Sequence, residues 1–267
     1  MRPILITDPG DPQIAAFREV RERDLVGRQG RSVAEGEVVL RALLSDASRH
    51  EAEAVLIAES RWPRLADALE ASRAPVFTAG QDVMDAVAGF HIHRGILAMG
   101  RRAEPLAAAD MLAEPDRDDI ALAVVGVGNH DNMGGLFRAA AGFGARGVLL
   151  DPGCCDPLYR KAIRVSVGAA LTTPFARLES GADIAEVLIG LGYQPLALSP
   201  EGGERLADLR RDGPAAVVVG AEGPGLSETL MARCRRVSIP MATGWDSLNV
   251  ATAAAIALHQ LRFAAPS

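Results

Sequence analysis

Asn132 and Arg138 lie in a glycine-containing segment that follows a strongly apolar run of the chain. The segment reads G-N-H-D-N-M-G-G-L-F-R-A-A over residues 128–140. Gly134 and Gly135 would let the backbone approach a ligand closely, and a helix beginning here would present free N–H groups to an anion. The dinucleotide-binding pattern G-x-G-x-x-G fails, because Asp131 stands where the third glycine would fall. The segment therefore indicates a binding turn that carries an amide and a guanidinium.

Two more segments, nearer the carboxyl end, combine glycines with polar side chains. The first, V-V-V-G-A-E-G-P-G-L-S (217–227), has three glycines around Glu222. Its backbone could wrap a planar ligand, although a tight strand-to-helix turn would use the same residues. The second (237–258) reads V-S-I-P-M-A-T-G-W-D-S-L-N-V and then becomes an alanine-rich helix. Ser247 is the predicted N-cap of that helix, whose small residues suit close packing in the core or against a second subunit.

The apolar runs before and between these segments are predicted to be buried strands. They occupy residues 121–127, 147–150, 195–198, 215–219 and 236–239, and helical segments separate them. Continuous apolar strands that alternate with helices indicate a parallel sheet covered on both faces. Because ligands of such sheets bind beyond the carboxyl ends of the strands, we expect the three polar segments to form one site.

The amino-terminal part is predicted to be a smaller α/β domain. Residues 32–35 (S-V-A-E) have the form of a capping box and predict a helix that carries Val38, Val39, Leu43 and Leu44 at helical spacing. Short strands are expected at 54–58, 76–79 and 96–99, with helices near 63–71 and 82–88. The segment 106–118 is acidic and contains a proline, so we expect it to link a domain at 1–105 to one at 119–267.

The composition excludes several classes of protein. The 267 residues are 49% hydrophobic, 23% charged and 4% aromatic, as in a globular protein. No apolar stretch reaches the roughly 20 residues of a membrane span, and the amino end lacks a signal-peptide pattern, so a cytoplasmic protein without a membrane partner is expected. Lys161 is the only lysine and follows Arg160, which excludes a Walker A loop. The cysteines lack zinc spacing, and His91 and His93 have no third ligand nearby, so no metal is expected.

Taken in order, the three segments resemble the motifs of the SpoU, or TrmH-like, RNA ribose 2′-O-methyltransferases of the SPOUT superfamily. The motifs are N-x-G-x-x-x-R (132–138), G-x-E-G-x-G (220–225) and I-P-M (239–241) followed by S-L-N-V (247–250). Residues 156–170 also resemble the family's segment between its first two motifs. The amino-terminal half, from A-E-G (34–36) to G-F-H-I-H-R-G-I-L-A (89–98), is similar to the RNA substrate-binding domain often fused to this family.

The resemblance implies a catalytic domain with a trefoil knot, whose loops hold S-adenosylmethionine. By their places in the motifs, the residues that would bind this cofactor are Gly220, Gly223, Ile239, Met241 and Leu248. Leu198, at the end of an intervening strand, is expected to line the same pocket. Those that would serve catalysis at a ribose 2′-hydroxyl are Arg138, Asn132, Glu222, Ser247 and Asn249. Methyl transfer is an in-line displacement, so these residues must align the methyl group with the hydroxyl and assist loss of its proton.

Arg138 stands at the position to which the family assigns the general base. A guanidinium holds its proton at neutral pH, so two roles remain open: its surroundings make it a base, or it anchors an RNA phosphate while another group accepts the proton. A protein with a net charge of −6 needs a local basic strip to bind RNA. The candidates are Arg138, Arg160, Lys161 and Arg164, and a second run of arginines, interrupted by acids, occupies 18–31.

The sequence therefore predicts an α/β protein that uses S-adenosylmethionine to methylate RNA as a homodimer paired through the methyltransferase domain. The amino-terminal domain favours ribosomal RNA over tRNA, because the tRNA-specific branch usually lacks it, and DNA is not an expected partner. A drug-resistance methylase acting on the same RNA class also fits. A non-catalytic RNA-binding ribosome-assembly protein of this fold is disfavoured by the intact motif residues, and a nucleotide-binding oxidoreductase by the missing third glycine.

Overall fold

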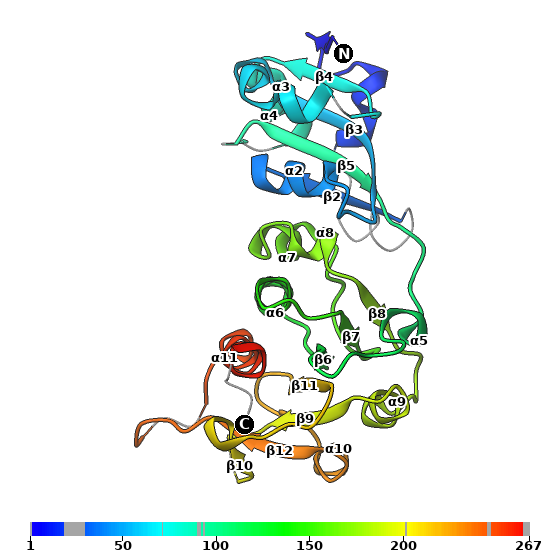
Figure 1. The fold of residues 1–267 in the computed structure, drawn as a ribbon. Coiled ribbons are helices and arrows are strands. Elements are labelled where there is room, and N and C mark those ends of the chain that lie inside the picture. The colour runs from blue at the N-terminus through cyan, green and yellow to red at the C-terminus, as the bar shows by residue number, and fades with distance from the viewer. Residues whose placement is uncertain are drawn as a thin grey trace. The chain divides into compact units, whose positions relative to one another are not determined.

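The computed structural model describes residues 2–18, 30–70, 72–89, 92, 94–200, 202–244 and 247–263. The chain folds into two compact units. The first comprises Met1–Glu104 and Leu158–Thr172, and the second comprises Pro105–Pro157 and Thr173–Ser267. Each unit contains its own β-sheet and its own apolar core (Figure 1).

The first unit is built on a five-stranded mixed sheet in the order β1-β4-β3-β5-β2. Its strands are β1 (Ile4–Ile6), β2 (Arg31–Glu35), β3 (Glu51–Ala58), β4 (Val76–Ala79) and β5 (Ile96–Arg101). β1 and β3 pair with β4 in parallel, whereas β2 and β3 pair with β5 in the antiparallel direction. The strands predicted at 54–58, 76–79 and 96–99 are confirmed, each lying within an observed strand, but β1 and β2 were not predicted.

Helices cover both faces of this sheet. They are η1 (Pro12–Phe17), α2 (Glu37–Leu44), η2 (Glu59–Arg61), α3 (Trp62–Glu70), α4 (Gln81–Ala88), α7 (Arg160–Val165) and α8 (Ala169–Thr172). Ile14 of η1 and Met84 of α4 are buried with Leu56 and Phe77 of the sheet in one core cluster. The predicted helices near 63–71 and 82–88 correspond to α3 and α4.

The capping box predicted at residues 32–35 is wrong. These residues form β2, along which burial alternates with the period of two expected for a strand, and Ser32 and Ala34 are each 1% exposed. The helix begins only after Gly36, which is the N-cap of α2. Gly36 has a φ of 92°, a conformation that glycine adopts without a steric penalty, so the chain can turn there from strand into helix.

The second unit is built on a seven-stranded parallel sheet in the order β10-β12-β9-β11-β6-β7-β8. Its strands are β6 (Ile120–Val125), β7 (Val148–Leu150), β8 (Phe175–Arg177), β9 (Gln194–Leu198), β10 (Glu204–Arg205), β11 (Ala215–Gly220) and β12 (Arg235–Ser238). The five predicted apolar runs correspond to β6, β7, β9, β11 and β12. The short strands β8 and β10 were not predicted.

Helices also cover both faces of the parallel sheet. They are α5 (Ala108–Met111), α6 (His130–Gly142), α9 (Ile184–Gly190), η3 (Leu206–Asp208), α10 (Glu228–Met231) and α11 (Val250–Phe263). α6 and α11 lie side by side on one face, and α5 and α9 lie on the other (Figure 1). Met111 and Leu112, within the segment 106–118, are buried in the core beneath α9.

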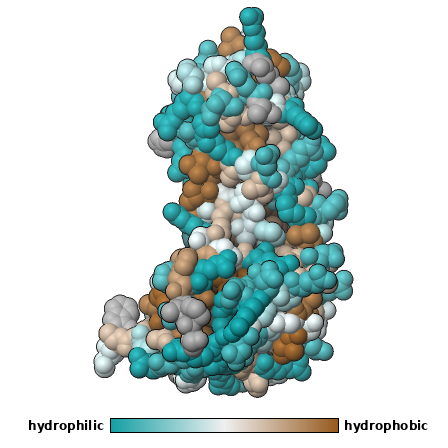
Figure 2. Space-filling view, in the orientation of Figure 1, coloured by the Kyte–Doolittle hydropathy of each residue, from teal (hydrophilic) through white to brown (hydrophobic). Residues whose placement is uncertain are grey.

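Hydrophilic side chains cover most of the face shown in Figure 2, and apolar side chains occur there in separate patches. This is the surface expected where amphipathic helices pack their apolar stripes against a sheet and turn their polar sides outward.

Candidate functional site

A pocket of about 620 Å³ lies at the carboxyl ends of three neighbouring strands of the second unit. β9 ends at Leu198, β11 at Gly220 and β12 at Ser238, and β9 pairs with both of the others. Parallel sheets bind ligands at this edge, and small-molecule pockets usually measure about 300–1,000 Å³. The geometry therefore suits a ligand of nucleoside size.

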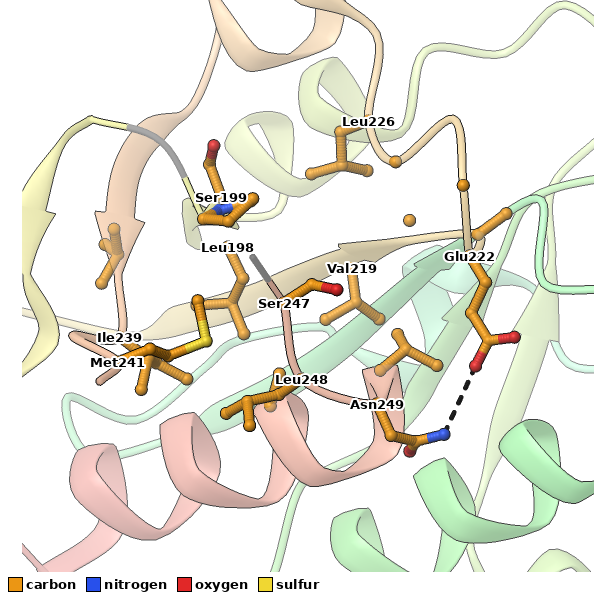
Figure 3. Close-up of a pocket in the computed structure, with 18 residues that line it drawn as sticks. Leu198, Ser199, Val219, Glu222, Leu226, Ile239, Met241, Ser247, Leu248 and Asn249 are labelled. Atoms are coloured by element: carbon orange, nitrogen blue, oxygen red, sulfur yellow. Dashed lines mark hydrogen bonds between the residues drawn. The ribbon is translucent and has the colours of Figure 1, made fainter. Parts of the chain in front are cut away.

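The wall of this pocket is largely apolar (Figure 3). Ile239 and Met241 lie next to Leu198, and Leu248 approaches from the segment that precedes α11 (Figure 3). Polar groups come from Ser199, Glu222, Ser247 and Asn249. The six positions predicted for the cofactor all line this one pocket: Leu198, Gly220, Gly223, Ile239, Met241 and Leu248.

The loop after β11 folds back on itself and forms one side of the pocket. Ala221 and Gly225 form an antiparallel bridge, in which the Gly225 N–H donates to the Ala221 carbonyl at 3.0 Å. Gly223 and Gly225 have left-handed φ values of 87° and 64°. A Cβ at Gly220 would lie 2.4 Å from the carbonyl carbon of Gly225. The close approach of two backbone segments therefore requires glycine at position 220.

Asn132, Glu222 and Asn249, one from each sequence motif, form a connected hydrogen-bond network. Asn132 Nδ2 donates to Glu222 Oε1 at 2.8 Å, and Asn249 Nδ2 donates to Asn132 Oδ1 at 2.8 Å. Asn249 Nδ2 also lies 3.4 Å from Glu222 Oε1, the contact drawn in Figure 3. Asn132 is only 7% exposed. The network holds the Glu222 carboxylate at the edge of the pocket. It joins Asn132 to Glu222 and Asn249, which lie 90 and 117 residues further along the sequence.

Asparagine side chains also cap the amino-terminal ends of α6 and α11, the two helices next to the pocket. Asn249 Oδ1 accepts hydrogen bonds from the backbone N–H groups two and three residues ahead, at 2.9 and 3.3 Å, and so caps α11. Asn129 caps α6 in the same way. The prediction that Ser247 is the N-cap of α11 is wrong, because the helix begins later and Ser247 lines the pocket instead.

The two helices approach closely where both carry small residues. A Cβ at Gly135 of α6 would lie 2.7 Å from the Cβ of Ala251 on α11. Of the two uses suggested for the small residues of α11, packing within the unit is therefore the one seen at Ala251.

Arg138 lies on the exposed side of α6 and does not line the pocket. It follows Gly135 by three residues, which places it nearly one turn further along α6 and about 60° around the helix from the contact with α11. Its guanidinium forms no hydrogen bond or ion pair with the residues that the structure describes. The structure therefore brings four of the predicted catalytic residues to the pocket or its network, and leaves Arg138 outside with its guanidinium accessible.

The other residues predicted to contact RNA lie on α7 in the first unit. Arg160 Nε is 3.7 Å from Glu35 Oε2, whereas Lys161 and Arg164 have exposed side chains. Most of the arginine run at 18–31, and both His91 and His93, lie outside the described residues. Among the residues that are described, no group of three His, Cys, Asp or Glu side chains could hold a metal ion, and no helix is long and apolar enough to cross a membrane.

Sequence reasoning missed two residues that support the first motif. Asp151 Oδ1 accepts a hydrogen bond from the Gly126 N–H at 2.9 Å, and Arg177 donates to the carbonyls of Asp151, Cys154 and Cys155 at 2.8 to 3.0 Å. The place of Asp151, directly after an apolar strand, was a usable signal, but nothing in the sequence pattern indicated Arg177.

Burial raises the pKa of Cys154 to about 12 and that of Cys155 to about 11, so both thiols remain protonated at neutral pH.

The parallel sheet covered on both faces, with a pocket at the strand ends, defines an α/β ligand-binding domain. The SpoU rRNA Methylase family matches residues 119–259 of the chain, which comprise most of this domain together with residues 158–172 of the first unit. An uncharacterised tRNA/rRNA methyltransferase of Mycobacterium bovis is 40% identical over 265 residues, which cover 96% of this chain and 90% of that relative. The chain belongs to the SpoU rRNA methylase family.

Solved structures share the fold over both units. A crystal structure of an RNA 2′-O ribose methyltransferase superposes with a TM-score of 0.76 at 25% identity, covering 97% of this chain and 98% of the other. An AdoMet-bound rRNA methyltransferase from Sinorhizobium meliloti gives a TM-score of 0.76 at 22% identity, covering 97% of each chain. The predicted fold class is confirmed, while the trefoil knot stays a prediction because strand order does not define how the loops thread.

Proposed function

We propose that this protein is an S-adenosylmethionine-dependent RNA methyltransferase that methylates a ribose 2′-hydroxyl in ribosomal RNA. The observation that carries the proposal is the pocket at the ends of β9, β11 and β12, which gathers the second and third motifs and is tied to the first through Asn132. Membership in the SpoU rRNA methylase family supports the reaction. The similar proteins named as tRNA/rRNA and RNA 2′-O ribose methyltransferases support the substrate class.

The residues of the pocket fit S-adenosylmethionine. Leu198, Ile239 and Leu248 offer apolar walls for a planar adenine, and the backbone of the loop after β11 offers hydrogen-bonding groups. The Glu222 carboxylate complements a positively charged ligand. When bound, S-adenosylmethionine supplies a methyl group on a cationic sulfur, which a hydroxyl oxygen can attack.

In the proposed reaction, the residues around the pocket position the reactants. Asn132 and Asn249 hold the Glu222 carboxylate, and Ser247 and Leu248 close the pocket beside it. Of the two roles open to Arg138, we favour the RNA anchor, because its exposed guanidinium has no carboxylate partner among the described residues and pairs well with phosphate. Arg138 then orients the ribose beside the pocket, and a group other than Arg138 accepts the hydroxyl proton as the oxygen–methyl bond forms and the methyl–sulfur bond breaks.

We further propose a homodimer paired through the second unit. Ile256 and Phe263 of α11 are 40% and 63% exposed and provide apolar surface for it. The first unit is proposed to bind the RNA substrate, in the cytoplasm where that RNA is found. A knotted arrangement of the loops around the pocket is part of the same proposal.

The proposal is tested by transfer of labelled methyl groups from S-adenosylmethionine to separate rRNA and tRNA fractions that lack the modification. We expect label at one ribose of rRNA, and we expect Arg138→Ala to abolish it while S-adenosylhomocysteine still binds. Label in tRNA alone would select the tRNA alternative, and label on a base would refute the ribose assignment. A chain that binds RNA but not S-adenosylhomocysteine would be the non-catalytic RNA-binding protein instead.

A further inference from the structure

A second pocket, of about 420 Å³, lies within the first unit and is lined by three arginines. Arg61 comes from the end of η2, Arg94 from the turn before β5, and Arg164 from α7. The remaining lining residues are Glu37 and four apolar ones, Val38, Val39, Ile96 and Val167. It shares no residue with the pocket at the ends of β9, β11 and β12.

The arginines of this second pocket carry uncompensated charge. None of the three guanidinium groups forms a hydrogen bond or ion pair with any residue that the structure describes. Glu37, by contrast, is already neutralised by arginines outside the pocket, since its two carboxylate oxygens lie 3.3 Å from Arg41 Nε and 2.7 Å from Arg64 Nε. Three guanidinium groups around one cavity, with the acid among the lining residues already paired, form a site for an anion that carries several oxygens.

The two sequence motifs of the amino-terminal half meet at this pocket. The A-E-G motif ends at Gly36, whose N–H donates to the Ile96 carbonyl at 3.2 Å, and Arg94 belongs to the second motif. A Cβ at residue 36 would lie 2.9 Å from Arg94 Cδ. Glycine at position 36 therefore leaves the space in which the Arg94 side chain lies over the start of α2.

Val167 adds an independent sign of a binding site. Its φ of 56° lies in the left-handed region, which a β-branched residue rarely adopts. The Val167 N–H donates to the Arg164 carbonyl at 3.1 Å, and this turn ends α7 with both residues lining the pocket. Val167 and Val38 are 37% and 58% exposed, so apolar surface is left open beside the arginines. Backbone strain of this kind is concentrated at ligand-binding sites.

We propose that this second pocket binds a phosphodiester of single-stranded RNA together with the adjoining nucleotide, an inference that rests on the proposed function. Guanidinium forks pair with phosphate oxygens, and the four apolar residues accept a sugar or base. A concave site of this volume suits one splayed nucleotide, because bases within a helix are stacked and cannot enter it. The pocket is an RNA anchor built from residues other than those assigned to methyl transfer.

The test measures binding of the full chain to a fluorescein-labelled, single-stranded RNA of mixed sequence by anisotropy at several salt concentrations. Arg61, Arg94 and Arg164 are changed to glutamine singly and together. We expect the triple variant to bind at least about tenfold more weakly, and its salt dependence of log K to fall by about 2, since each lost contact to single-stranded nucleic acid removes about 0.7. Arg73→Gln is the matched control, because Arg73 is exposed in the same unit, has no partner among the described residues and lines neither pocket. It should bind like the wild type.

Two further arms separate recognition of phosphate at the pocket from a general effect of the protein's charge. Val38→Glu, at an exposed position, places a carboxylate at the pocket without removing an arginine, and should also weaken RNA binding. The same oligonucleotide with uncharged methylphosphonate linkages should bind the wild type and the triple variant equally. Three results would each refute the RNA assignment. The first is equal RNA affinity in the wild type and the triple variant, and the second is an equal loss of RNA affinity in Arg73→Gln. The third is displacement of the RNA by micromolar inorganic phosphate.

Calorimetry with S-adenosylhomocysteine keeps this inference distinguishable from the proposed function. The arginine variants should bind it as the wild type does, which also shows that they fold. A wild type that binds RNA through the second pocket but not S-adenosylhomocysteine would refute the methyltransferase proposal alone. Normal S-adenosylhomocysteine binding, with RNA affinity unaffected by the three arginines, would refute the anchor alone.

Discussion

Gly220→Ala tests whether the close approach of two backbone segments forms the first pocket. The added Cβ would lie 2.4 Å from the Gly225 carbonyl carbon, 2.5 Å from its oxygen and 2.8 Å from the Leu226 nitrogen. Reaching an ordinary contact of 3.4 Å requires the loop to move by about 1 Å. Because all three atoms belong to the backbone, no side-chain rotation can relieve the clash.

The expected magnitudes follow from that displacement. Overpacking of this kind costs about 1–3 kcal/mol of folding free energy. A shift of about 1 Å would also break hydrogen bonds between the loop backbone and the bound ligand, each of which contributes about 0.5–1.5 kcal/mol net. Loss of two such bonds would weaken ligand binding by roughly 5- to 150-fold. Affinity for S-adenosylhomocysteine should therefore fall by at least about fivefold, while the protein stays folded.

Calorimetric titration with S-adenosylhomocysteine measures the effect, and thermal unfolding measures stability. Gly128→Ala, just before the first motif, is the matched control, since a Cβ there would meet nothing within 4 Å and its φ is not left-handed. It should leave both quantities near the wild-type values. Gly220→Ala binding within about twofold of wild type, with unchanged stability, would refute the reasoning about the loop and the assignment of the pocket.

Three further changes test other parts of the structure. Asn132→Asp should lower the free energy of unfolding at neutral pH by about 2–4 kcal/mol, because it replaces the donor 2.8 Å from Glu222 Oε1 by a like charge. Such a pair raises the pKa of one carboxyl, so urea titrations should show recovery as the pH falls toward about 4, and a pH-independent loss would contradict this. The Tyr193 hydroxyl is buried without a hydrogen-bond partner in the described part of the chain, and burial raises the pKa of Tyr193 to about 12, so the folded state keeps a proton that the unfolded state loses above about pH 10. Tyr193→Phe should therefore reduce the alkaline loss of stability by about 1 kcal/mol near pH 11 in urea titrations, and identical pH dependence would contradict this. Val167→Gly should raise the free energy of unfolding by about 1 kcal/mol through relief of its left-handed strain, whereas Val167→Ala should change it little; a lower melting temperature for the glycine variant would contradict that account.

The parallel sheet could be predicted from the sequence because its central strands are buried on both faces. β11 and β6 consist almost wholly of alanine and valine, isoleucine or leucine, and their residues are nearly all buried. A run of this kind has one stable environment, beneath helices on both sides. The unpredicted strands β8 and β10 have three and two residues, which are too few to establish any period. β7 also has three residues, but all three are apolar, whereas β8 ends in an arginine and β10 consists of two charged residues.

The wrong prediction of a capping box at β2 has a different cause. Residues 32–35 satisfy a local helix-start pattern, but the same residues also alternate between buried and partly exposed positions. Antiparallel pairing with β5, more than 60 residues away, makes these residues a strand and places Ala34 opposite Ala98. A rule that considers four neighbouring residues cannot include that pairing, so tertiary contacts override the capping signal.

The candidate site was predictable as a set of residues but not as a geometry. The resemblance supplied Asn132, Glu222 and Asn249 without showing that they bond to one another across 90 and 117 positions. It also placed Arg138 among the catalytic residues, although helical periodicity alone separates it from Asn132. Six residues on an α-helix correspond to a rotation of about 240°, so the two side chains cannot point in the same direction.

That separation on α6 explains how one helix can serve two ligands in the proposed reaction. The side with Asn132 is buried and fixes Glu222 at the pocket, whereas the side with Arg138 is exposed and available to a phosphate. The helix is held at its start by the Asn129 cap and along its length by the contact between Gly135 and Ala251. Since both side chains belong to one packed helix, the position of the cofactor and that of the ribose are set together, which is the alignment that an in-line methyl transfer requires. Arg138 therefore need not enter the pocket to be essential.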